Sequence, residues 1–139
     1  MDKNYQKELA RVRLERAREL YAEAKELLEK NAYKSANNRA YYAIEKSLKA
    51  LLAVKETDAA THSGVLKQFN YLYIYQGNGT FTSEDYQKAA QSEQVRNSSD
   101  YDDFYIADKE ESRQQVENAG YMIDKVEKYL KNECSESTL

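Results

Sequence analysis

The chain has no proline and no tryptophan, and only four of its 139 residues are glycine. Proline and glycine disfavour the interior of a helix more than any other residues, so their scarcity favours an all-α fold. A chain of this length suits one domain with a hydrophobic core of its own. We therefore predict an up-and-down antiparallel helical bundle of about five helices, in a single domain over residues 1–131.

Cysteine and long apolar runs are also scarce. Cys134 is the only cysteine, so no internal disulfide can form, which fits a reducing cytoplasm. No apolar run approaches the length that crosses a bilayer, and the residues after Met1 lack the apolar core of a signal peptide. These absences predict a cytoplasmic protein that makes no contact with a membrane.

The sequence offers little for binding a metal or a cofactor. His62 and Cys134 are the only histidine and cysteine, and they lie too far apart in the sequence for the usual zinc site. The stretch Gly77-Asn78-Gly79 lacks the spacing and the lysine of a phosphate-binding loop. We expect no metal and no cofactor. The net charge of −3 provides no global basic field, so any contact with RNA must be a local site.

Apolar residues recur at steps of three and four in five segments, each of which we predict to be a helix. The segments are about Tyr5–Lys30, Tyr33–Lys55, His62–Gln76, Ser83 to the stretch Arg96–Tyr101, and Lys109–Lys131. Thr61 or Ser63 can cap the third helix, and Thr82 or Ser83 can cap the fourth. The connector from Asp100 to Asp108 is acidic and aromatic, and residues 132–139 form a polar tail that we expect to be disordered.

The second helix is apolar around so much of its circumference that we expect it at the centre of the bundle. Asn37, Asn38 and Arg39 interrupt its apolar surface. An unpaired polar group in a buried helix costs about 1–3 kcal/mol, so these side chains need partners. We expect Arg39 either to reach an acidic residue on a neighbouring helix or to face the same site as Arg96.

The fourth helix carries a stripe that changes from apolar to charged. Tyr86, Ala89, Glu93, Arg96 and Asp100 share one face of this helix. One interpretation of Arg96 is an ion pair within the bundle or a dimer, with Glu93 or an aspartate of the connector. The other is that two copies of Arg96 line a dimer cleft and bind a phosphate.

His62, at the start of the third helix, has three possible roles. It can cap its helix, form a hydrogen bond to the second helix, or belong to a functional site. Its position favours one of the two structural roles, because a side chain that opens a helix has partners close by.

Three motifs occur in order along the chain. They are Asn38-Arg39-Ala40-Tyr41-Tyr42-Ala43-Ile44, then Thr61-His62-Ser63-Gly64, then Arg96-Asn97 to Asp100-Tyr101-Asp102. Together they resemble the HEPN family of small bacterial and archaeal helical domains, over about Tyr5–Leu130. The resemblance implies an up-and-down helical bundle that pairs about a two-fold axis. In active members an arginine, the polar residue after it and a histidine five positions beyond the arginine meet their symmetry mates in a cleft and cut RNA without a metal.

In this chain Arg96 matches the family's arginine and Asn97 matches the polar residue, but Tyr101 stands where the histidine is expected. A histidine can take and give a proton near neutral pH, whereas a tyrosine ordinarily keeps its proton until about pH 10. The resemblance therefore implies an Arg-x4-Tyr variant in which the usual ribonuclease chemistry lacks its base.

The family also includes partners of minimal nucleotidyltransferases in two-gene toxin–antitoxin modules, and in some of these the enzyme adds AMP to a tyrosine near the motif. Our leading hypothesis is a homodimer that binds RNA or nucleotide phosphate in its cleft and works with such a nucleotidyltransferase. The candidate ligand-binding residues are Asn38, Arg39, His62, Arg96, Asn97 and Asp100.

Two alternatives have different chemistry. The first is a metal-independent endoribonuclease in which Arg96 acts with Tyr101, or with His62 as the proton-transfer group. The second is a protein that accepts AMP on Tyr101 or Tyr105.

Overall fold

The computed structural model describes the backbone of residues 3–138 and the side chains of residues 3–133. It contains five α-helices and one π-helical segment, and the described residues include no strand. The elements are α1 (Lys3–Glu29), α2 (Tyr33–Ala53), α3 (His62–Phe69), η1 (Asn70–Tyr75), α4 (Ser83–Tyr101) and α5 (Lys109–Thr138). The prediction of an all-α bundle of about five helices is confirmed.

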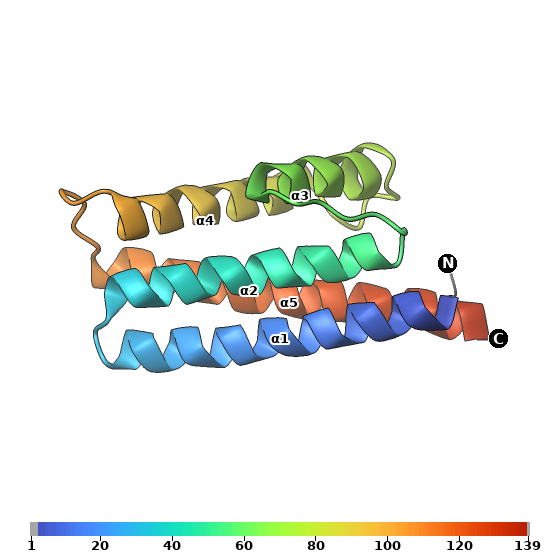
Figure 1. Cartoon of the computed structure of the whole chain (residues 1–139), viewed down its shortest axis with the longest axis horizontal. Helices are drawn as coiled ribbons and strands as arrows, with labels where there is room; N and C mark the ends of the chain where they lie inside the picture. Colours follow the sequence, from blue (N-terminus) through green and yellow to red (C-terminus); the bar gives the residue numbers. More distant parts are fainter. Residues whose placement is uncertain (1–2, 139) are drawn as a thin grey trace.

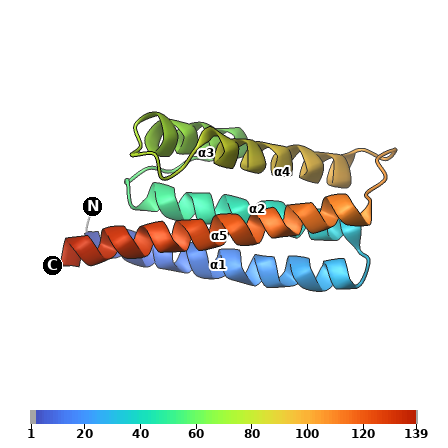
Figure 2. The same cartoon turned by 180° about the vertical axis from the view of Figure 1, so that it is seen from behind.

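Helix α2 lies at the centre of the bundle, as its apolar circumference predicts. It packs against α1 and α5 on one side and against α3 and α4 on the other (Figures 1 and 2). The four long helices alternate in direction, while α3 and η1 run the same way as α2. Fully buried side chains of α2 include Tyr41, Ile44, Leu48 and Leu51. Because α2 lies between α1 and α4, its buried polar side chains need hydrogen-bond partners within the bundle.

The sequence predicted the starts of α3 and α4 correctly, and the structure selects one capping residue for each. The hydroxyl of Thr61 accepts a hydrogen bond of 3.0 Å from the backbone amide of Gly64. Thr82 and Asp85 form a capping box at the start of α4, in which the amide of Thr82 donates to the Asp85 carboxylate at 3.0 Å. These caps set the position at which α3 and α4 begin on the surface of α2.

The third helix differs from its prediction. We expected one helix from His62 to Gln76, but the α-helix ends at Phe69 and η1 follows as a π-helix. Tyr73 of η1 is buried, and its hydroxyl donates a hydrogen bond to the backbone carbonyl of Leu51 in α2. The apolar spacing did not reveal this change, because six residues are too few to separate the period of a π-helix from that of an α-helix.

The end of the last helix also differs. We predicted that it ends at Lys131, whereas the backbone of α5 continues to Thr138. Leu139 and the side chains beyond Glu133 lie outside the described residues, so the expected disorder of residues 132–139 stays a prediction.

A buried carboxylate joins α4 to α5. The Asp85 side chain is only 1% exposed, and its two oxygens accept hydrogen bonds of 2.7 Å from the Tyr121 hydroxyl and the Lys125 ammonium group. Burial alone would raise the pKa of Asp85, but the hydrogen bonds from Lys125, Tyr121 and the Thr82 amide outweigh burial and hold this pKa below its usual value. Asp85 is therefore ionised in the fold at neutral pH and couples the start of α4 to the middle of α5.

We expect Asp85→Asn to lower the free energy of unfolding by about 2–3 kcal/mol at neutral pH, because it removes the charge from these hydrogen bonds. The lowered pKa means that the ionised carboxylate stabilises the fold above the ordinary aspartate pKa, and that this stabilisation is lost as the pH falls. Urea unfolding across the acidic range checks this. The difference between wild type and variant should be largest near pH 7 and should shrink below about pH 4, and a difference independent of pH would contradict it.

Candidate functional site

The guanidinium group of Arg96 lies between α2 and α4 rather than in solvent, and the residue is 6% exposed. Its Nη1 donates a hydrogen bond of 2.9 Å to the Asn97 side chain. Its Nη2 donates to the hydroxyls of Tyr42 at 2.6 Å and Tyr101 at 3.2 Å. Its Nε lies 3.0 Å from a carboxylate oxygen of Asp100, as an ion pair without hydrogen-bond alignment. The structure thus realises the ion-pair interpretation of Arg96, with Asp100 as the partner.

Three tyrosine rings surround the same guanidinium group. Its central carbon lies 5.7 Å from the ring centre of Tyr41, 5.1 Å from that of Tyr42 and 5.2 Å from that of Tyr101. Cation–π contacts at such distances are worth about 0.5–2 kcal/mol each, depending on how dry the site is. The rings replace part of the hydration that Arg96 loses on burial, and Arg96 in turn orients the rings.

The polar contacts continue from α4 across α2 to α1. The Asn38 amide donates to the Asp100 carboxylate at 2.9 Å, and Arg39 donates to the Asn38 oxygen at 2.6 Å. Arg39 also forms an ion pair of 2.9 Å with Glu23 on α1. Both expectations for Arg39 are therefore met, since it reaches an acid on a neighbouring helix and joins the site of Arg96. We call this connected set the Arg96 network, whose members are Glu23, Asn38, Arg39, Tyr42, Arg96, Asn97, Asp100 and Tyr101.

His62 lies beside the Arg96 network and forms a hydrogen bond to the second helix, as its position allowed. Its Nδ1 contacts a carboxylate oxygen of Glu45, which is 6% exposed. The Tyr41 hydroxyl donates to the same oxygen at 2.7 Å. Burial and the hydrogen bond to Glu45 raise the pKa of Tyr41 far above its usual value, so this hydroxyl remains a donor. The rings of Tyr41 and Tyr42 pack edge-on against the imidazole, at 5.3 and 5.9 Å between centres.

Tyr105, the second candidate for AMP addition, lies apart from the Arg96 network. Its hydroxyl donates to Glu111, and its ring lies 5.9 Å from the ammonium group of Lys34. Tyr101, by contrast, is 72% exposed while its hydroxyl touches Arg96.

A groove beside the Arg96 network is lined by more positive than negative side chains. It has a volume of about 250 Å³ and shares Glu23, Asn38, Arg39 and Tyr42 with the network. The complete lining is Arg16, Leu20, Glu23, Asn38, Arg39, Tyr42 and Lys46, and we call it the basic groove. Glu23 is shared by two arginines, at 2.9 Å from Arg39 and 3.4 Å from Arg16, so positive charge is in excess over negative.

Burial and neighbouring positive charges disfavour the charged form of Lys46 in the basic groove. Its pKa is lowered, first by burial and then by repulsion from Lys49 and Arg13. Among the residues that the structure describes, no carboxylate forms an ion pair with Lys46. A phosphate in the basic groove would relieve this repulsion.

The sequence did not identify several residues of the site as functional candidates, chiefly Tyr41, Tyr42, Glu45 and Lys46. One signal was present, because Glu45 is the only acidic residue of α2 and stands in its apolar middle. A carboxylate in that position needs partners, and they are Tyr41 and His62.

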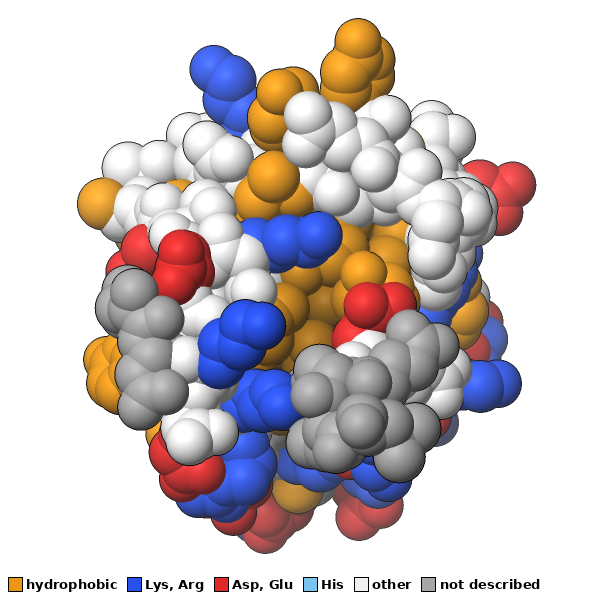
Figure 3. All heavy atoms as spheres, turned by 90° about the vertical axis from the view of Figure 1, so that its right-hand side faces the viewer, with side chains coloured by type: hydrophobic (Ala, Val, Ile, Leu, Met, Phe, Trp, Pro, Cys, Tyr) orange, Lys and Arg blue, Asp and Glu red, His pale blue; other side chains and the backbone are white. Residues whose placement is uncertain are grey.

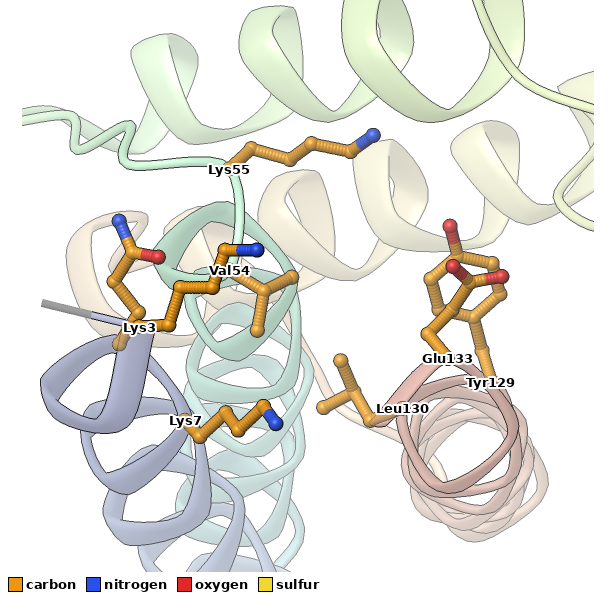
Figure 4. A pocket seen from close by; sticks show the side chains of 8 residues that line it. Lys3, Lys7, Val54, Lys55, Tyr129, Leu130 and Glu133 are labelled. Carbon is orange, nitrogen blue, oxygen red and sulfur yellow. The ribbon is translucent and has the colours of Figure 1, made fainter. Parts of the chain in front are cut away.

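A second hollow, of about 200 Å³, lies at the end of the bundle where both chain termini are found (Figures 3 and 4). Lys3, Lys7 and Lys55 stand around apolar atoms of Val54 and Leu130 there. None of the residues that the sequence predicts for a site lines this hollow.

Among the described residues, no group of three or more histidine, cysteine, aspartate or glutamate side chains is placed so that it could hold a metal ion. None of the described helices combines the length and the apolar character needed to cross a membrane.

Comparison with known proteins places this chain in a family. A protein of Methanocaldococcus jannaschii named "Putative toxin MJ0605" is 34% identical over 122 residues, which cover 85% of this chain and 86% of that protein. A second protein of that organism, "Putative toxin MJ0142", is 29% identical over 94% of this chain and 86% of its own length. A Thermotoga maritima protein named "UPF0332 protein" is 30% identical over 84% of this chain and 87% of its own length. Residues 10–129 match the HEPN domain family, and the chain therefore belongs to that family.

Proposed function

We propose that this protein is a toxin-like HEPN protein that binds RNA, or the phosphate of a nucleotide, at the basic groove and the adjoining Arg96 network. The observation that carries the proposal is that the basic groove shares Tyr42, Asn38 and Arg39 with the network. A phosphate held by the cations of the groove would lie next to aromatic rings that can contact a base or a ribose.

The balance of charge assigns different roles to the two parts of the site. Arg96 is already paired with Asp100, and Glu45 lies close by, so an anion gains little by approaching Arg96 directly. Lys46 has no ion-pair partner among the described residues and is repelled by its neighbours. The basic groove therefore attracts the phosphate, and Arg96 holds Tyr42 and Tyr101 in place for the nucleoside.

Exposed apolar side chains next to the site support the proposed homodimer. Tyr101, Phe104 and Ile106 are 72%, 94% and 87% exposed, and all three lie at the end of α4 or in the connector that follows. Exposed apolar residues that cluster in this way mark interaction surfaces. A two-fold contact through this surface would bring two copies of the Arg96 network together.

The similarity to proteins named as toxins supports the toxin-like part of the proposal. The minimal nucleotidyltransferase partner rests on the family resemblance, and cytoplasmic location rests on the single cysteine and the lack of a long apolar run.

We expect Lys46→Ala to weaken binding of a fluorescein-labelled single-stranded RNA pool about three- to tenfold and to reduce the slope of log affinity against log salt by about one. Arg96→Ala should weaken binding by about tenfold or more, because Tyr42 and Tyr101 lose their shared partner. Fluorescence anisotropy at several salt concentrations measures both effects.

Two matched variants control for charge alone. Lys128→Ala removes an exposed lysine of α5, and Arg113→Ala removes an arginine that is paired with Glu110 and Glu117. Both should bind RNA as wild type does. Unchanged binding by Arg96→Ala and Lys46→Ala would rule out this site.

The double substitution Phe104→Ser, Ile106→Ser should shift the protein from dimer to monomer while keeping the helical fold, because both side chains are exposed in the single chain. Light scattering coupled to size-exclusion chromatography measures the mass. Tyr71→Ser, Tyr75→Ser is the matched control, since these rings are also exposed but lie in η1. A wild-type protein that remains monomeric at high concentration would contradict the dimer.

A second candidate function is acceptance of AMP on Tyr101, for which the exposure of this residue is the specific observation. The phenolic oxygen would attack the α-phosphate of ATP bound to a nucleotidyltransferase. A new O–P bond would form, pyrophosphate would leave, and the phenolic proton would pass to solvent. Arg96, at 3.2 Å from the hydroxyl, could then contact the new phosphate.

Co-expression with a minimal nucleotidyltransferase encoded beside this gene should add the mass of one AMP, and intact-mass spectrometry detects it. Tyr101→Phe should abolish the added mass, whereas Tyr105→Phe should keep it, because the Tyr105 hydroxyl is bound to Glu111. Modification that survives in Tyr101→Phe would exclude Tyr101 as the acceptor.

A further inference from the structure

We infer that the hollow at the end of the bundle where the chain termini lie binds a small organic anion, namely a carboxylate on a short aliphatic chain. We call it the terminal hollow, and its three lysines are Lys3, Lys7 and Lys55. It lies at the opposite end of the bundle from the connector between α4 and α5, whereas the Arg96 network lies beside that connector (Figure 1). The inference is therefore independent of the proposed RNA binding.

Ion pairs do not balance the positive charge of the terminal hollow. Lys3 and Lys7 stand four residues apart on α1, so they share one face of that helix, where like charges repel. Lys55 follows the end of α2, and its ammonium group lies 5.6 Å from the centre of the Tyr73 ring. Within the part of the chain that the structure describes, no carboxylate forms an ion pair with any of these three lysines. An anion in the terminal hollow would reduce the repulsion between them.

The start of α1 adds to the positive potential. The backbone amides of a first helical turn have no partner within the helix, and the helix dipole is positive there. The described first turn of α1 contains no acidic residue. Gln6 of this turn lines the terminal hollow and is 8% exposed, and its Nε2 has no hydrogen-bond partner. A buried amide donor without an acceptor destabilises the fold, and a carboxylate oxygen beside Gln6 would supply one.

The acid that does line the terminal hollow stands away from the lysines. Glu133 lies one turn beyond Tyr129 on α5, and burial and then the charge of Glu133 raise the pKa of Tyr129. Figure 4 shows Glu133 beside Tyr129, on the side of the hollow formed by α5. The opposite side, formed by α1 and the end of α2, therefore remains free for the negative end of a ligand.

The floor of the terminal hollow is aliphatic. In Figure 4 the side chains of Lys3 and Lys7 extend from α1 toward Val54 and Leu130. An inorganic anion held by the lysines would leave these apolar atoms facing water. An aliphatic chain attached to the anion would cover them, and the hydrophobic effect would add to the attraction between the charges.

The size of the terminal hollow limits the length of that chain. Its volume of about 200 Å³ equals the space of roughly six or seven water molecules at about 30 Å³ each. Pockets that enclose a drug-sized ligand have about 300–1,000 Å³, so a nucleotide is too large for this one. Hexanoate, with its carboxylate toward the lysines and its methyl end toward Leu130, matches both the charge and the volume.

The test is an NMR titration of the ¹⁵N-labelled full-length protein with hexanoate, acetate and 1-hexanol in parallel. Hexanoate should give saturable shifts of the backbone amides in residues 3–7, 54–55 and 129–133. Affinity should rise about two- to fourfold for each methylene between acetate and hexanoate, and should stop rising in longer carboxylates whose chains leave the hollow. 1-Hexanol, which lacks the charge, should bind about tenfold more weakly than hexanoate.

Substitutions within the terminal hollow separate the contribution of charge from that of the floor. Lys7→Gln should weaken hexanoate binding about three- to tenfold, since it removes one ammonium group and keeps most of the aliphatic stem. Val54→Thr should weaken it about two- to fourfold, because a hydroxyl replaces a methyl group of the floor. Lys109→Gln is the matched control, as it removes the same charge at the start of α5, and it should bind hexanoate as wild type does. Circular dichroism checks that each variant keeps its helices.

Four results would overturn the inference. The first is that hexanoate gives no saturable shift up to about 10 mM, where binding would be too weak to be specific. The second is that acetate binds as tightly as hexanoate, which would mean that the lysines attract any anion. The third is equal binding of 1-hexanol, which would make the carboxylate irrelevant. The fourth is unchanged hexanoate affinity in both Lys7→Gln and Val54→Thr, which would place the ligand elsewhere.

Discussion

The burial of one arginine between α2 and α4 imposes most of the polar arrangement of this molecule. A guanidinium group removed from water must find acceptors for its donors and a counter-charge, or the fold loses several kcal/mol. Here one asparagine, two tyrosine hydroxyls and the Asp100 carboxylate supply them, and three aromatic rings enclose the group. Each of these partners is itself held by a helix. The positions of α2 and α4 are thereby fixed relative to each other around Arg96.

A chain with a net charge of −3 can still hold a local excess of positive charge. Asp100 and Glu45 lie near the buried arginine, whereas along the groove Arg16, Arg39 and Lys46 outnumber the single acid, Glu23. Long-range attraction to a polyanion is weak in such a molecule, so the proposed binding would depend on the few cations of the groove. A high salt concentration should matter for these contacts more than for the buried ones.

Tyr101 stands where active members of the family have a histidine, and the one histidine of this chain, His62, lies elsewhere in the site. Tyr101 keeps the position five residues after the arginine and the hydrogen bond to it, and it adds an exposed phenol. His62 provides a titratable ring with one nitrogen on a buried carboxylate and the other free. The aromatic pair Tyr41–Tyr42 lies between the two residues and contacts both Arg96 and His62. The position of the expected histidine is therefore occupied by a phenol that accepts a hydrogen bond from Arg96, and the imidazole lies on α3 instead.

The absence of proline and the spacing of apolar residues by themselves determined the helical fold, the central place of α2 and the starts of α3 and α4, because these follow from the pattern of residues along each helix. The same local rules placed Arg96 and Asp100 on one face, where they pair. Only the tertiary structure decided that Asn38 and Arg39 join Arg96, that Glu45 faces His62, and that Tyr105 stands apart. The contacts of Asn38 with Asp100 and of Glu45 with His62 join different helices, and periodicity along one helix carries no information about which side chain of another helix lies opposite.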